Sequence, residues 1–182
     1  MHTSVLIIPG IGNSGHEHWQ SLWEAADPSM VRIQMDDWEH PVHTSWVKAI
    51  EDEVIRAGES VVVVAHSLGC LAFAGWAAKR KRIVRGALLV AVPDPCGSNF
   101  PTQADGFAHL PLSRLPYRSI VVSSQNDPYG SPEYAKSCAD VWGSTFVDIG
   151  RAGHINGASN LGAWPAGLKL LDELRSPSPT WM

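Results

Sequence analysis

The most informative segment of the chain reads Val61-Val62-Val63-Val64-Ala65-His66-Ser67-Leu68-Gly69-Cys70-Leu71-Ala72. Four consecutive β-branched residues predict a strand buried on both faces, as the strands of parallel sheets are. From Leu71 onward, small and apolar residues lead to the basic run 79–82, which is typical of the end of a helix. A buried strand followed directly by a helix indicates an α/β protein.

The turn between this strand and helix, Ala65-His66-Ser67-Leu68-Gly69, is a near match to the G-x-S-x-G nucleophile elbow. In such an elbow the serine sits on a sharp turn, so its Oγ is exposed at the carboxyl edge of the sheet. The residues two before and two after the serine must be small, because the strand and helix backbones cross there. Gly69 meets this requirement, and Ala65 exceeds it by one methyl group. The pentapeptide alone leaves open a plain turn in which Ser67 only caps the helix.

Strand and helix patterns alternate along the rest of the chain. The valine run is one predicted strand, and the others are Ser4–Ile8, Val31–Met35, Ala87–Val92, Ser119–Ser124 and Thr145–Ile149. Besides the helix from Leu71, the predicted helices are Glu17–Ala26, Trp46–Arg56, Pro132–Trp142 and Leu161–Leu174. This alternation predicts a three-layer α/β fold, with a parallel sheet of six strands and helices on both faces.

The length of 182 residues suits one domain, which we expect to span 1–175, followed by a frayed tail at 176–182. Residues 93–118 are rich in Pro, Gly and Ser and show little periodicity, so we predict a long surface loop there. No cap domain is expected in a chain of this length.

Composition excludes several functional classes. The net charge of −4 and the lack of a longer basic run than 79–82 argue against nucleic acid as a partner. The apolar stretch 61–78 is interrupted by His66, Ser67 and two glycines, so it is not expected to span a membrane. The N-terminus lacks the basic region of a signal peptide. The three cysteines are Cys70, Cys96 and Cys138. Their odd number and the lack of C-x-x-C spacing argue against a disulfide framework or a zinc site, and free cysteines suit the reducing cytoplasm.

Two further residues complete a candidate catalytic triad. Asp127 follows the fifth predicted strand, and His154 lies in the loop after the sixth. Because the carboxyl ends of parallel strands share one edge of the sheet, both can converge on Ser67. His154 would take the serine proton, and Asp127 would fix the imidazole tautomer. Taken singly, Asp127 could be a turn residue and His154 a surface-loop histidine, but their coincidence at the right strand ends favours the triad.

The remaining site residues follow from this triad. The oxyanion hole would use the backbone N–H of Leu68 and one from the first loop, with Ile11 expected and Gly12 as the alternative. In the absence of a cap domain, loop 93–118 would wall the substrate pocket. Its apolar side chains could contact the acyl group or simply pack the loop onto the core: Phe100, Phe107 and Leu110.

A dinucleotide-binding protein is an alternative interpretation. The first loop, 10–15, also reads as G-x-G-x-x-G between a strand and a helix. Asp36 or Asp37 lies about where a ribose-binding acid would stand. A lone fingerprint is weak, however, and it leaves the elbow, Asp127 and His154 unexplained.

Two kinds of binding site remain to be weighed. A non-catalytic scaffold that binds another protein would need a docking patch, and Trp38 and Trp181 are the tryptophans least tied to helical core spacing. A metal site at His16 and His18 is not expected, because residues two apart on a helix face away from each other.

The chain resembles the small serine hydrolases of the YdeN and retinoblastoma-binding protein 9 family. The resemblance rests on Pro9-Gly10, His18-Trp19, Trp23 and the elbow, and continues through Ser124-Gln125-Asn126-Asp127-Pro128-Tyr129, Gly153-His154-Ile155-Asn156 and 162–164. It implies a compact α/β-hydrolase fold, the triad Ser67, Asp127 and His154, and neither metal nor cofactor. The family's retinoblastoma-type partner is not implied, because Leu68-Gly69-Cys70-Leu71-Ala72 lacks the acid of L-x-C-x-E.

From these observations we expect the strand order 2-1-3-4-5-6. We also expect a serine hydrolase that cleaves small carboxylic esters with short acyl chains through an acyl-enzyme on Ser67. Amidase or aminopeptidase-like activity is the alternative within the same family.

Overall fold

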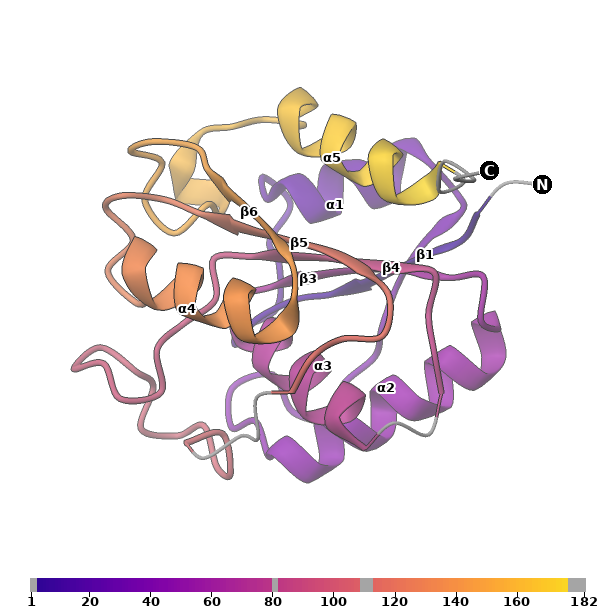
Figure 1. Cartoon of the computed structure of the whole chain (residues 1–182), viewed down its shortest axis with the longest axis horizontal. Helices are drawn as coiled ribbons and strands as arrows, with labels where there is room; N and C mark the ends of the chain where they lie inside the picture. The colour runs from indigo at the N-terminus through magenta and orange to yellow at the C-terminus, as the bar shows by residue number, and fades with distance from the viewer. Residues whose placement is uncertain (1–2, 80–81, 109–112, 177–182) are drawn as a thin grey trace.

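The computed structural model describes residues 3–79, 82–108 and 113–176. Its centre is a parallel sheet of six strands in the order β2-β1-β3-β4-β5-β6 (Figure 1). The strands are β1 (Val5–Ile8), β2 (Met30–Arg32), β3 (Val62–His66), β4 (Gly86–Val90), β5 (Arg118–Ser123) and β6 (Thr145–Asp148). The predicted fold class and strand order are confirmed.

Helices cover both faces of the sheet (Figure 1). One face is covered by α1 (Trp19–Ala26) and α5 (Pro165–Arg175), and the other by α2 (His43–Ala57), α3 (Leu68–Ala78) and α4 (Pro132–Trp142). A short 3₁₀ turn, η1 (Gly157–Ser159), precedes α5. In the described residues, the connection from β4 to β5 contains no helix.

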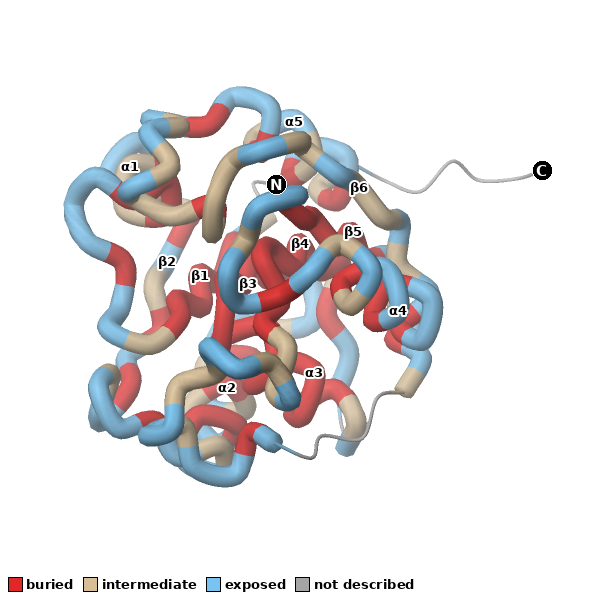
Figure 2. Tube along the Cα trace, turned by 90° about the vertical axis from the view of Figure 1, so that its left-hand side faces the viewer, coloured by how far each residue is buried: buried red, intermediate tan, exposed pale blue. Residues whose placement is uncertain are grey.

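The valine run supplies both hydrophobic cores. Successive side chains of a strand point to opposite faces. Accordingly Val63 belongs to the core under α2, α3 and α4, and Val62 and Val64 belong to the core under α1 and α5. Every residue of β3 is buried, as expected for a strand in the middle of a parallel sheet. Figure 2 shows this buried interior enclosed by exposed helix faces and loops.

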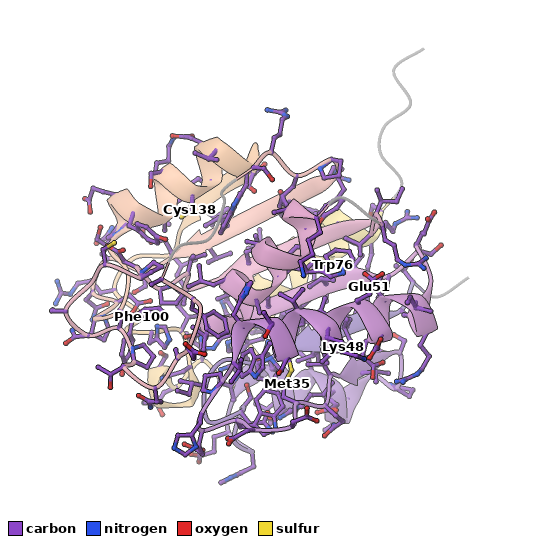
Figure 3. All side chains as sticks on the ribbon, turned by 90° about the horizontal axis from the view of Figure 1, so that it is seen from below. Met35, Lys48, Glu51, Trp76, Phe100 and Cys138 are labelled. Carbon is purple, nitrogen blue, oxygen red and sulfur yellow. The ribbon has the colours of Figure 1, made fainter. Side chains whose placement is uncertain are left out.

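Side-chain hydrogen bonds join the helices to neighbouring segments, in addition to apolar packing. The indole N–H of Trp76 in α3 donates to Glu51 of α2 at 2.6 Å, and Figure 3 shows the two side chains together. On the opposite face, the indole N–H of Trp19 donates to the carbonyl of Ile155 at 2.7 Å. This second bond joins α1 to the loop after β6, which bears His154.

The last helix begins later than predicted. Trp164 has a left-handed backbone (φ 42°) and is the N-cap residue, and Pro165 occupies the first turn. Proline is favoured there because the first helical N–H groups have no partner within the helix. Of the predicted tail, 176–182, only Ser176 lies among the described residues. None of the helices in the described part of the chain is long and apolar enough to cross a membrane.

Candidate active site

Ser67 stands at the sharp turn between β3 and α3. Its backbone has φ 53° and ψ −126°, a conformation that residues other than glycine rarely adopt. The N–H of Ser67 donates to the carbonyl of Val90 on the neighbouring strand at 2.9 Å. The side chain makes no capping bond to α3, so Ser67 is not the simple helix cap that the pentapeptide alone allowed.

The elbow requires very small neighbours. A Cβ added at Gly69 would lie 2.5 Å from the carbonyl oxygen of Pro9 and 2.6 Å from that of Ile8. A Cβ added at Gly10 would lie 2.8 Å from the Cβ of Ser67. Contacts this short are sterically forbidden, so both glycines allow the first loop to pack directly against the elbow.

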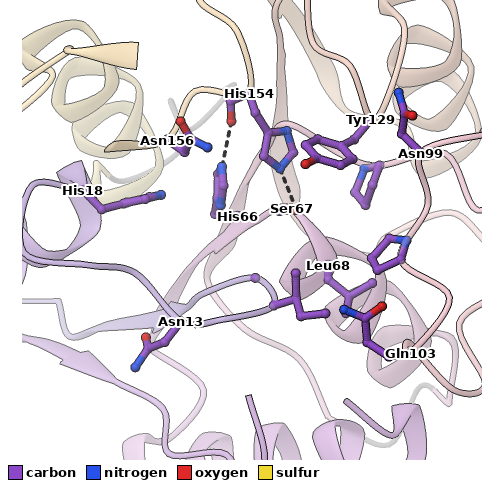
Figure 4. A pocket seen from close by; sticks show the side chains of 14 residues that line it. Asn13, His18, His66, Ser67, Leu68, Asn99, Gln103, Tyr129, His154 and Asn156 are labelled. Carbon is purple, nitrogen blue, oxygen red and sulfur yellow. Dashed lines mark hydrogen bonds between the residues drawn. The ribbon is translucent and has the colours of Figure 1, made fainter. Parts of the chain in front are cut away.

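The structure brings Ser67, His154 and Asp127 together in one hydrogen-bonded row. Figure 4 shows the bond between Ser67 and His154. Oγ of Ser67 lies 2.8 Å from Nε2 of His154, and Nδ1 of His154 lies 2.9 and 2.8 Å from the two carboxylate oxygens of Asp127. Because a carboxylate can only accept, Nδ1 carries the imidazole proton and Nε2 is free to accept from the serine hydroxyl. The Asp127 side chain is 1% exposed and that of His154 is 10% exposed.

A network of polar side chains holds the loop that bears His154. Oγ of Ser124 accepts from the backbone N–H of Ala152, and Oδ1 of Asn126 accepts from that of Gly153, both at 2.9 Å. The Ser124 hydroxyl also donates to Asn126 Oδ1 at 3.1 Å. The segment after β5 therefore carries Asp127 and also fixes the path of the histidine loop.

His66 is a site residue that sequence reasoning missed. Its Nε2–H donates to the backbone carbonyl of His154 at 2.9 Å, and the side chain is buried. Burial lowers the pKa of His66 well below its ordinary value, and the neighbouring His154 and His18 lower it further. His66 is therefore a neutral donor. The only sequence signal for His66 is its position directly before Ser67, where the elbow motif allows any residue.

His18 also lines the pocket, which the sequence did not reveal. It is the N-cap of α1, where its Nδ1 accepts from the backbone N–H of Gln20 at 3.1 Å. Its ring lies 4.7 Å from that of His66 in an edge-to-face arrangement. Burial, followed by the charges of Arg32 and His154, lowers the pKa of His18 to about 4.

The two residues expected to supply the oxyanion-hole N–H groups, Leu68 and Ile11, both line the pocket beside Ser67. Leu68 opens α3, so its N–H is among those left without an intrahelical acceptor. Ile11 follows Gly10 in the first loop. The alternative donor, Gly12, is engaged elsewhere, because its N–H donates to the carbonyl of Trp38 at 2.9 Å.

A pocket of about 380 Å³ opens over the hydroxyl of Ser67. Besides the residues above, loop 93–108 contributes to its wall, as does Tyr129, whose ring centre lies 4.6 Å from that of His154. The loop residues at the pocket are Pro93, Asn99, Pro101 and Gln103.

The aromatic residues predicted to wall the pocket lie elsewhere. Phe107 is fully buried in the core, with its ring edge-on to those of His43 and Trp46, so its prediction as a pocket residue is wrong. Phe100 (Figure 3) is half-buried against the same core and does not line the pocket. Both aromatic rings pack the loop onto the core, which was the alternative to a pocket role, because burying an aromatic ring is strongly favourable. Leu110 lies outside the described residues.

Comparison with known structures supports this architecture. A YdeN-like hydrolase from Pectobacterium atrosepticum is 32% identical, with a TM-score of 0.83 over 94% of this chain and 90% of that chain. The ydeN gene product from B. subtilis is 17% identical, with a TM-score of 0.78 over 96% and 100% of the two chains. A thermophilic esterase from Thermogutta terrifontis is 16% identical, with a TM-score of 0.68 over 95% and 90%. The latter two show similarity of fold alone.

A comparison with curated proteins gives no match. The model of the serine hydrolase family matches residues 5–173, which is nearly the whole described chain. The predicted resemblance to YdeN-like hydrolases is confirmed by this match and by the 32% identical structure. The chain belongs to the serine hydrolase family.

Proposed function

We propose that this hydrolase cleaves small carboxylic esters with short acyl chains through an acyl-enzyme on Ser67. The observation that carries the proposal is the row of hydrogen bonds from Ser67 Oγ through His154 to Asp127. A nucleophile, a base within hydrogen-bonding distance and a buried carboxylate that orients the base are the parts that acyl transfer requires.

In the first half of the reaction, Ser67 Oγ attacks the ester carbonyl carbon while its proton passes to Nε2 of His154. The carbonyl oxygen becomes an oxyanion, which the N–H groups of Leu68 and Ile11 stabilise. When this intermediate collapses, the bond to the alcohol oxygen breaks and His154 donates its proton to the departing alcohol. Asp127 stabilises the imidazolium that exists between the two proton transfers.

In the second half, water replaces the alcohol. His154 takes a proton from water, the resulting hydroxide attacks the acyl-enzyme carbonyl, and the same N–H groups stabilise the second oxyanion. Collapse breaks the bond to Ser67 Oγ, which recovers its proton from His154. The products are a carboxylic acid and an alcohol, and the protein is regenerated.

The size and lining of the pocket support the preference for short acyl chains. Its volume of about 380 Å³ is near the lower end for small-molecule sites, and its wall includes several polar side chains. The apolar side chains that could have held a long chain, Phe100 and Phe107, pack against the core instead.

Labelling with a fluorophosphonate probe tests the nucleophile. We expect the wild type to be labelled and Ser67→Ala to be unlabelled, while the control Ser137→Ala, on the exposed side of α4, labels like the wild type. Labelling that persists in Ser67→Ala would remove the assignment. Saturable NAD binding without labelling would favour the dinucleotide alternative, and a stable protein partner with neither property would favour the scaffold.

A series of p-nitrophenyl esters tests the acyl preference. We expect kcat/KM to be highest for the acetate and butyrate and lowest for the decanoate. A higher value for the decanoate would contradict the short-chain assignment. Faster cleavage of matched anilides than of esters would favour the amidase alternative.

A further inference from the structure

The ring of His18 presents a defined hydrogen-bond donor in the wall of the pocket. Its Nδ1 accepts from the backbone N–H of Gln20. A backbone N–H can only donate, so Nδ1 is the unprotonated nitrogen. The ring is neutral at pH 7, because burial lowers the pKa of His18 to about 4. Its single proton is therefore on Nε2.

This Nε2–H has no hydrogen-bond partner among the described residues. His18 as a whole is 5% exposed, and its Nε2 is buried. An unpaired buried donor destabilises the folded state, and such groups are rare in native structures. The ring of the adjacent His66 lies in an edge-to-face arrangement with that of His18 and gives it no hydrogen-bond acceptor. The Nε2–H of His66 itself donates to the carbonyl of His154. Figure 4 shows the far end of the His18 ring directed toward the ring of His66, and both rings line the pocket.

Asn156 presents a second donor at the same end of the pocket. Its Oδ1 accepts from the backbone N–H of Ala158 at 3.1 Å, which again can only donate. The assignment of the amide is thereby fixed, and the NH₂ group remains for a ligand. Figure 4 shows this amide between His18 and His154. No carboxylate is among the described residues that line the pocket.

We propose that His18 is a specificity-determining residue whose Nε2–H donates to a second oxygen acceptor of the substrate, a ketone, ether or ester oxygen beyond the scissile group. The NH₂ of Asn156 supports the same oxygen. The preferred substrates are then short oxygenated esters, because their oxygen satisfies a donor that a plain alkyl chain leaves unpaired. This inference rests on the proposed esterase function and names its substrate class.

Two matched substrate pairs test it, one for each half of the ester. The first pair is p-nitrophenyl levulinate and p-nitrophenyl pentanoate, which differ by one ketone oxygen in the acyl chain. The second is 2-methoxyethyl butyrate and butyl butyrate, in which an ether oxygen replaces one methylene group of the alcohol. Each ratio of kcat/KM is divided by the ratio of the hydroxide-catalysed rates, which removes intrinsic reactivity.

Two variants remove the donor in different ways. His18→Asn keeps a side-chain oxygen that can cap α1 and removes the donor Nε2–H. His18→Phe keeps the ring and removes both nitrogens. His16→Asn makes the same chemical change at an exposed position outside the pocket and serves as the control.

We expect the wild type and His16→Asn to prefer the oxygenated ester of at least one pair by roughly tenfold, the effect of one hydrogen bond. Both His18 variants should lower that ratio severalfold toward one, whatever their absolute rate on the plain esters. Plain esters hydrolysed by the wild type with no oxygen preference would overturn this inference and leave the proposed function intact. An undiminished preference in either folded His18 variant would overturn it as well. Absence of hydrolysis and of Ser67 labelling would overturn both proposals.

Discussion

Nε2 of His66 lies 2.9 Å from the backbone carbonyl oxygen of His154. The residue before the nucleophile therefore holds the main chain of the proposed general base. Loss of this bond would remove one of the contacts that hold the histidine loop, and misplacement of reacting groups by about 1 Å can cost about 10²-fold in rate.

We expect His66→Ala to lower kcat by about 10–100-fold while KM changes little. His66→Gln should recover much of this loss, because its side-chain N–H can donate to the same carbonyl. Steady-state kinetics of the two variants provide the measurement. Equal activity of the alanine and glutamine variants would show that His66 only fills space.

Replacing Asp127 by asparagine should affect catalysis much more than folding. An amide donates as well as accepts, so His154 would turn its unprotonated Nδ1 toward it and carry the proton on Nε2, where it cannot accept from Ser67. We expect kcat to fall by about 10⁴-fold. The rate of fluorophosphonate labelling should fall in parallel, with a midpoint of urea unfolding close to that of the wild type. Rapid labelling of Asp127→Asn would contradict the assigned tautomer.

Stability should fall as the pH is lowered from about 6.5 to about 4. The pKa of His18 is about 4 in the folded protein and near its ordinary value of 6.5 in the unfolded chain, so the unfolded chain binds more protons in this range. The loss for His18 alone is on the order of 2–3 kcal/mol. The lowered pKa of His66 adds to the loss in the same direction.

Urea unfolding at a series of pH values measures this dependence. We expect His18→Asn to flatten the slope of unfolding free energy against pH, while the control His16→Asn keeps the wild-type slope. A His18→Asn protein with an unchanged slope would show that His18 does not carry the effect.

Gly69→Ala should destabilise the protein by about 1–3 kcal/mol, because the added methyl group would press against the carbonyls of Ile8 and Pro9. Gly15→Ala is the matched control, since nothing lies within 4 Å of a Cβ added there. Chemical denaturation compares the two. Equal midpoints would mean that the first loop moves away from the elbow without cost.

The sheet and the row of three polar residues could be predicted because they depend on patterns that are local in sequence. A run of four valines directly before a helix pattern predicts a buried strand. Asp127 and His154 each follow a predicted strand, and the carboxyl ends of parallel strands share one edge of the sheet. The strand order follows from the same alternation once the family resemblance is added.

What the sequence could not supply depends on contacts between distant segments. Phe107 lies in a stretch without periodicity, and nothing local indicates that its ring packs against His43 and Trp46. The choice between Ile11 and Gly12 depends on a carbonyl from Trp38. The donor role of His18 emerges only when the backbone of Gln20 has fixed its tautomer.

The backbone of Ser67 adopts a conformation that costs folding free energy. A serine held at φ 53° and ψ −126° is disfavoured by about 1–3 kcal/mol relative to a glycine in the same place. The folded protein is therefore less stable than it would be with a relaxed turn, and the strained turn holds the Ser67 hydroxyl in position for attack. Stabilising this chain at its elbow and preserving its reactivity are opposing goals, so engineering for thermal resistance should begin far from β3.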